Sequence, residues 1–287
     1  MNSPRVAGVL YFVTHVTSVA ALVLYGPVLN HPDYVTGPGR DTQILVGGLL
    51  EVVLALAVVG TAVALYPILT RYSPGGALGY AALRTLEAAT ILVGVVTLLG
   101  VVTLRQQYAG TAATDTAALT VSGRALVAVH DWTFVIGPGL VVGVNTTVLA
   151  LALYRFRLVP RFIPVLGLIG GPLVFASNLG VLFGGYTQES GFTAVGAVPV
   201  FAWEISLAAY LDVKGIRTRI DEPSGVPTGV AVPALNVVRS ESPPLPPDVP
   251  AQVCSIVERA MAKDPADRWP SATELAAAAR DVEWRDG

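Results

Sequence analysis

The chain has 287 residues, of which 53% are hydrophobic and only 13% are charged, and its mean hydropathy is +0.62. A soluble domain covers its surface with charged side chains, so this composition excludes an ordinary soluble protein and indicates a chain solvated by lipid. The formal net charge of −2 argues against nucleic-acid binding, which requires a basic face. Cys254 is the only cysteine, which excludes a disulfide framework and a metal site built from several thiolates.

Six apolar stretches are long enough to cross the bilayer, because a helix needs about 20 residues to span roughly 30 Å of hydrocarbon. We predict an all-α fold, a six-helix transmembrane bundle in a lipid bilayer, with spans at 6–29, 44–69, 77–104, 129–154, 163–185 and 193–213. The first stretch could alternatively be a cleaved signal peptide, since Arg5 precedes it. Its apolar run continues past Ala20, however, and is too long for that role.

The orientation follows from Lys and Arg residues near the span ends, which are in excess on the cytoplasmic side. Eight flank the spans on one side: Arg5, Arg71, Arg155, Arg157, Arg161, Lys214, Arg217 and Arg219. Three flank them on the other: Arg40, Arg105 and Arg124. We therefore expect the N- and C-termini to be cytoplasmic.

Glycines spaced four residues apart predict close helix packing, because they allow two helix backbones to approach in lipid. The pairs are Gly139/Gly143, Gly167/Gly171 and Gly180/Gly184. Asn145 begins a glycosylation acceptor motif, but it lies within the fourth span. Its amide is instead expected to hydrogen-bond to a neighbouring helix.

Ionisable side chains inside the spans form a predicted polar cluster, a candidate ligand or proton site, because an unpaired charge there costs several kcal/mol. The cluster comprises His15, Glu51, Arg84, Glu87, His130, Asp131 and Glu204. Arg84 and Glu87 are three residues apart on one helix face, which predicts an intrahelical ion pair. His130 and Asp131 are expected at the mouth of the fourth span.

Two interpretations of this cluster remain open. In the first, the groups only stabilise the bundle: Arg84 neutralises one carboxylate, His15 bonds to another, and burial protonates the rest. In the second, the carboxylates that exceed Arg84 form a site for a proton, a metal ion or an organic cation. The second interpretation predicts a transport-like protein or a small-ligand-binding protein.

An enzyme is a rival hypothesis, in which His130 and Asp131 act as acid and base near the outer face. The residue types of His15, Glu51, His130 and Asp131 also suit a metal ion, but no HExxH-like spacing supports one. The sequence predicts neither a resident metal nor another cofactor, and the catalytic residues of any enzyme stay unassigned.

Short segments in every span carry a family resemblance. They are residues 7–11 with Thr14 and His15, 49–52, 84–87, 130–134, 157–164 and 201–204. Through them the chain resembles the bacterial domain-of-unknown-function family 4386 over about residues 5–217. The resemblance implies a multi-pass membrane protein whose first helix is retained, and it implies no activity. We expect the protein to lie in the cytoplasmic (inner) membrane.

The residues after the last span differ in composition from the spans. We therefore divide the whole chain into three domains: the spans at 1–217, a linker at 218–247 and a fragment at 248–287. The linker is rich in Pro and Ser and is expected to be disordered. Two helical patterns follow at 251–262 and 272–282. Ser271 is a good N-cap for the second, and Glu274 completes a capping box.

The last segment, 260–272, resembles the end of a bacterial serine/threonine kinase domain, with a Lys-Asp-Pro-x-x-Arg turn that includes Arg268. The ATP-binding and catalytic motifs of such kinases are absent, which excludes kinase activity. The fragment is either a loosely ordered remnant of a gene fusion or a docking hairpin for a protein partner, and a docking hairpin would make the protein a membrane scaffold or sensor. Hydrogen exchange would separate the two, because full amide protection contradicts a remnant.

Overall fold

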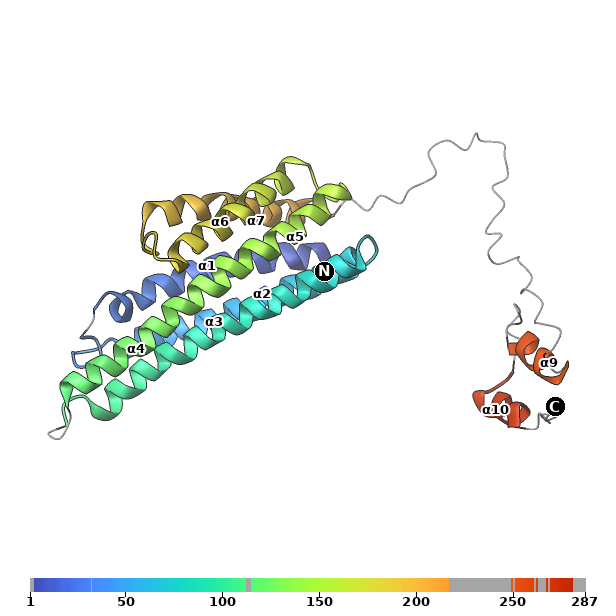
Figure 1. Ribbon diagram of the computed structural model, residues 1–287, viewed down its shortest axis with the longest axis horizontal. Helices are drawn as coiled ribbons and strands as arrows, with labels where there is room; N and C mark the ends of the chain where they lie inside the picture. The colour runs from blue at the N-terminus through green and yellow to red at the C-terminus, as the bar shows by residue number, and fades with distance from the viewer. Residues whose placement is uncertain are drawn as a thin grey trace. The chain divides into compact units, whose positions relative to one another are not determined.

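The computed structural model describes residues 3–31, 33–111, 115–216, 249, 251–260, 262, 267 and 269–280 (Figure 1). These residues form two compact units, divided between Arg219 and Ile220. The predicted linker 218–247 and the residues Arg217 and Arg268 lie outside the described residues.

The first unit confirms the predicted six-span all-α fold: six of its described helices are long and apolar enough to cross a membrane. They are α1 (Ser3–Asn30), α2 (Asp41–Leu69), α3 (Pro74–Tyr108), a continuous helix at Thr116–Arg155, α6 (Phe162–Leu182) and α7 (Gly191–Val213). Several of them begin at side-chain caps. Ser73 accepts a hydrogen bond from the amide of Gly76, and Asp115 accepts from the amides of Ala117 and Ala118.

The fourth spanning helix is longer than predicted, because it begins at Thr116 rather than at residue 129. It consists of α4 (Thr116–Phe134), the π-helix η1 (Val135–Val141) and α5 (Val142–Arg155). Pro138 lies inside η1, where its missing N–H and its ring disrupt the regular α-helical pattern. His130 and Asp131, which were expected at the mouth of the fourth span, therefore follow several helical turns that begin at Thr116.

The spanning helices pack in a ring in which α7 closes back onto α1. The half of the bundle that contains Ala7 and Trp203, which we call the closed half, has one core built from α1, α2, α3, α5, α6 and α7. The other half, which we call the open half, has a core around Tyr25 and Leu98. That second core draws on α1 to α4 and the residues between α1 and α2, and it contains no residue of α6 or α7.

Glycines allow the close helix contacts of the closed half. A Cβ on Gly8 would lie 2.8 Å from backbone atoms of Ala208 and Asp212, so α1 and α7 touch directly. A Cβ on Gly171 would lie 2.7 Å from the carbonyl oxygen of Gly143, which brings α5 and α6 equally close. The predicted pairing of Gly180 with Gly184 is wrong, because Gly184 follows the end of α6 and adopts a φ of 73°.

In its described residues the second unit contains two short helices, α9 (Ala251–Ala260) and α10 (Ala272–Arg280), which contact each other. The ring nitrogen of Trp269 donates to the carbonyl oxygen of Ile256 at 3.3 Å, and the Arg259 guanidinium lies 4.4 Å from the Trp269 ring centre. The predicted cap is present, since Ser271 Oγ accepts from the amide of Glu274 at 3.2 Å.

Candidate functional site

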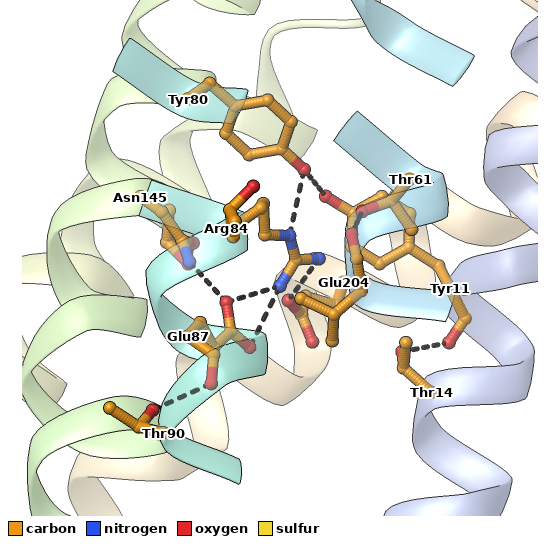
Figure 2. Close-up of polar contacts among 12 residues, drawn as sticks. Tyr11, Thr14, Thr61, Tyr80, Arg84, Glu87, Thr90, Asn145 and Glu204 are labelled. Atoms are coloured by element: carbon orange, nitrogen blue, oxygen red, sulfur yellow. Dashed lines mark hydrogen bonds and ion pairs between the residues drawn. The ribbon is translucent and has the colours of Figure 1, made fainter. Parts of the chain in front are cut away.

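Arg84 is the centre of a buried polar network at the boundary between the two halves of the bundle. Its side chain is only 3% exposed, and its Nη1 atom donates to both carboxylate oxygens of Glu87, at 3.2 and 3.0 Å. Its Nε atom donates to the Tyr80 hydroxyl at 3.2 Å, and that hydroxyl lies 2.7 Å from the hydroxyl of Tyr11 (Figure 2). The predicted intrahelical ion pair is therefore present, and it is linked to α1 through two tyrosines.

Glu87 has a full set of partners. Besides Arg84, its carboxylate accepts from the side-chain amide of Asn145 at 2.6 Å, which joins α3 to α5 (Figure 2). This contact confirms that the amide of Asn145 hydrogen-bonds to a neighbouring helix. A carboxylate that accepts from both a guanidinium and an amide is well compensated for its burial.

Glu204 of α7 is held more loosely. Its carboxylate lies 3.5 Å from His15 Nε2 and 3.7 Å from Arg84 Nη2. The second separation is an ion-pair distance but too long for a hydrogen bond, and Arg84 Nη2 is buried without a hydrogen bond among the described residues. Glu204 therefore shares one cation with Glu87 and depends on His15 for its closest contact.

Glu51 of α2 differs from both of these carboxylates. It accepts a hydrogen bond from the Tyr25 hydroxyl at 3.0 Å, and among the described residues no Lys or Arg lies within ion-pair distance of it. The ring of His130 stands edge-on to the Tyr25 ring, with the ring centres 5.9 Å apart. Glu51 is thus a membrane-embedded carboxylate without a permanent cationic partner in the described part of the chain.

A cavity of about 310 Å³ brings these groups together between the helices. Six of the seven predicted cluster residues line it: His15, Glu51, Arg84, Glu87, His130 and Glu204. Most of the remaining wall is apolar, with Leu22, Leu54, Ile91, Phe134, Val174 and Phe201 among its residues. This volume and this mixture of an apolar wall with few polar groups are typical of sites for small organic ligands.

Asp131 is separated from the other six residues. Its side chain is 54% exposed, and it lines a second cavity, beside Gly123 and Arg124. Its carboxylate lies 3.3 Å from Nδ1 of His130, whose ring faces the first cavity. Successive residues of a helix point in directions about 100° apart, so two neighbours in sequence reach different spaces.

Sequence reasoning missed two tyrosines of the site, Tyr25 and Tyr80. Tyr25 is the hydrogen-bond donor to Glu51, and Tyr80 connects Arg84 to Tyr11. A signal was available, because a tyrosine hydroxyl in the middle of an apolar span needs a polar partner. A metal centre receives no support: within the residues that the structure describes, no three His, Cys, Asp or Glu side chains are grouped to hold a metal ion.

A separate polar contact joins the connection after α1 to α2 and α3 at the far end of the open half. Asp41 accepts from the hydroxyl of Tyr34 at 2.9 Å and from Nε of Arg105 at 2.6 Å. Burial raises the pKa of the Tyr34 hydroxyl well above its usual range, and the hydrogen bond to Asp41 raises it further. These three residues do not line the first cavity, and their contact joins the ends of helices whose other side chains do.

The comparison with protein families identifies residues 6–215 as a domain of unknown function (DUF4386). No curated protein and no solved structure matches the chain. Since the matched region covers well over half of the chain, the protein belongs to this family of multi-pass membrane proteins. The match ends before the second unit, and no finding supports the predicted kinase-like fragment.

Proposed function

We propose that this member of the DUF4386 family binds a small organic cation in the cavity between its helices, as a ligand-binding or transport protein. One observation carries the proposal: Glu51, Glu87 and Glu204 face a single cavity together with one guanidinium, that of Arg84. Ionisable groups inside a membrane are retained at a considerable cost and usually mark the path or the site of a charged species.

Glu51 is the carboxylate that would receive the cation. Glu87 is already engaged by Arg84 and Asn145, and Glu204 lies close to Arg84 and His15. Glu51 has the Tyr25 hydroxyl as its only hydrogen-bond partner among the described residues, which leaves capacity on both of its oxygens. A bound cation would complete its set of partners.

The cavity wall favours an organic cation over a bare ion. A metal ion needs several oxygen or nitrogen ligands converging on one point, and the described residues offer no such group. Aromatic rings at Tyr25, Phe134 and Phe201 and aliphatic side chains instead suit a cation that carries apolar substituents. The excess carboxylates also suit proton exchange, which would couple release of the cation to protonation of Glu51.

An enzyme that uses His130 and Asp131 as acid and base has less support, because the two side chains line different cavities. In acid–base catalysis each group must lie within hydrogen-bonding reach of the atom of the bound substrate whose proton it transfers, so both groups must face one substrate. Asp131 orients the ring of His130 at most, through the contact of 3.3 Å between them.

We also propose that the protein lies in the cytoplasmic membrane of a bacterium with both termini in the cytoplasm. The distribution of Lys and Arg among the loops supports this orientation, which places the open half toward the outer face. Cys254, the sole cysteine, provides the test: a membrane-impermeant maleimide should label it only after the cells are broken. Labelling in intact cells would show that the C-terminus lies on the outer side and would contradict the proposed orientation.

Binding of radiolabelled benzyltrimethylammonium to the purified protein in lipid nanodiscs tests the main proposal. We expect saturable binding that Glu51→Gln weakens at least tenfold, because the substitution removes the charge and keeps the shape. Glu189→Gln is the matched control, since Glu189 is exposed between α6 and α7 and does not line the cavity. If binding is absent, or if Glu51→Gln leaves it unchanged, the carboxylates serve only to stabilise the bundle.

A further inference from the structure

The cavity adjoins an apolar groove on the outside of the bundle. The groove runs along α1 past Val16, Ala20, Val23 and Leu24, and three further residues line both the groove and the cavity: His15, Val19 and Phe201. These three side chains are therefore the partition between the polar interior and the surface of the bundle.

The groove exists because α1 and α7 share a core at one end only. In the closed half, Gly8 lies directly against the backbone of α7, and residues of both helices belong to one cluster. In the open half, α1 buries Ala21 and Tyr25 against α2, α3 and α4 in a core without α7. The first turns of α7 remain uncovered, with Phe192 74% exposed and Val195 66% exposed.

His15 and Phe201 differ in how firmly they are held. Nδ1 of His15 lies 2.8 Å from the carbonyl oxygen of Tyr11, and its Nε2 lies 3.5 Å from Glu204. Phe201 stands edge-on to the His15 ring, with the ring centres 4.8 Å apart, and it is 53% exposed. A phenyl ring makes no hydrogen bond, so Phe201 is the member of this partition that can rotate at less cost than His15.

The groove faces lipid, because it lies along spanning helices and its margins are apolar. Val16 and Val23 are each 69% exposed on this face of α1. From His15 to Leu24 the helix rises about 14 Å, a length over which an alkyl chain can lie along it. Lipid chains are the medium that this surface meets, so a ligand arriving here comes from the bilayer.

We propose that the cation is the head of an amphiphile that enters from the lipid between α1 and α7. Its charged head would reach Glu51 past Phe201, and its alkyl chain would lie in the groove along α1. This inference rests on the proposed function and adds the class of ligand, a singly charged ammonium amphiphile, and the route by which it arrives.

A pair of probes that share a head group tests this route. The affinities of butyltrimethylammonium and dodecyltrimethylammonium are measured by their competition with labelled benzyltrimethylammonium for the protein in nanodiscs. The free concentration of each probe is corrected for its partition into empty nanodiscs. We expect the dodecyl probe to bind at least tenfold more tightly. Val16→Trp and Val23→Trp, which fill the groove and do not line the cavity, should each remove most of that advantage and leave benzyltrimethylammonium binding unchanged.

The matched control is Val63→Trp, because Val63 is 66% exposed on α2 and lines neither the cavity nor the groove. A chain-length advantage that survives Val16→Trp and Val23→Trp, or that Val63→Trp also removes, overturns the lateral route and leaves the proposed function standing. Absence of binding by all three probes overturns the proposed function and the lateral route together.

Discussion

In the closed half of the bundle, six helical segments meet in one continuous core, and the largest side chain in it, Trp203, is 1% exposed. In the open half, α1 to α4 form a core of their own, and the cavity that carries the carboxylates lies between these helices and α6 and α7. The same spanning helices thus pack tightly at one end and enclose a cavity at the other.

This difference shows how a membrane protein can stay folded around a cavity that carries ionisable groups. Lipid is as apolar as leucine, so helices associate through close packing and hydrogen bonds rather than through apolar burial. The closed half provides the close packing at Gly8 and Gly171, and the network around Arg84 provides hydrogen bonds at the boundary. The open half is then free to leave Glu51 with few partners.

The largest effect is expected from Arg84→Met, which tests whether the boundary network stabilises the bundle. The substitution leaves the carboxylates of Glu87 and Glu204 buried without their shared cation. Loss of one partner from a buried ion pair costs about 3–5 kcal/mol. Reversible unfolding by dodecyl sulfate in mixed micelles, followed by tryptophan fluorescence, measures the loss in free energy of unfolding.

The double variant Arg84→Met with Glu87→Gln provides the control. It removes the charge of one of the two carboxylates that lost their cation, and it keeps a side-chain oxygen that can accept a hydrogen bond from Asn145. At least half of the lost free energy should return. A single variant as stable as the parent protein would show that the network is dispensable, and that packing alone holds the closed half together.

The spans could be predicted from the sequence, because hydropathy depends only on the length and composition of each apolar stretch. The start of the fourth helix could not be predicted in this way. Residues 116–128 carry Arg124 and several hydroxyl groups, and they lie against α3 in a way that only the folded chain reveals. The site could be predicted only in part, because some of its contacts also depend on the folded chain. Arg84 and Glu87 are near in sequence, but the approach of Glu51 to His130 depends on the ring order of the helices, which no local pattern contains.

The π-helix marks another limit of sequence reasoning. Pro138 between Gly137 and Gly139 signals a disrupted helix, but not that the disruption is absorbed as η1 within an unbroken span. The wider turns of a π-helix change the angular relation between residues before and after it. Asp131 and Asn145 are 14 residues apart, close to four α-helical turns, yet Asp131 lines the second cavity whereas Asn145 donates to Glu87.

A smaller effect is expected from Gly8→Ala, which tests the close packing of the closed half. The added methyl would lie 2.8 Å from backbone atoms of Ala208 and Asp212, so α1 and α7 must separate. Overpacking of this kind costs about 1–3 kcal/mol. The same unfolding experiment measures it, with Gly79→Ala in α3 as the matched control, because a Cβ there meets nothing within 4 Å.

The two glycine substitutions should have opposite signs. Alanine is favoured over glycine inside a helix by about 0.5–1 kcal/mol, so Gly79→Ala should stabilise the protein slightly. Equal stabilisation by Gly8→Ala would mean that α1 and α7 separate without cost, and the distinction between a closed and an open half would then fail.

The smallest effect is expected from Tyr25→Phe in the open half, and Tyr80→Phe in the closed half is its counterpart. Tyr25 loses one hydrogen bond, to Glu51, whereas Tyr80 loses contacts to both Tyr11 and Arg84. A hydrogen bond between membrane helices contributes about 0.6 kcal/mol on average. Tyr25→Phe should therefore lower the free energy of unfolding by about that amount, and Tyr80→Phe by clearly more. If the two losses are equal, Glu51 is held as firmly as the Arg84 network, and it is not the carboxylate left available for a ligand.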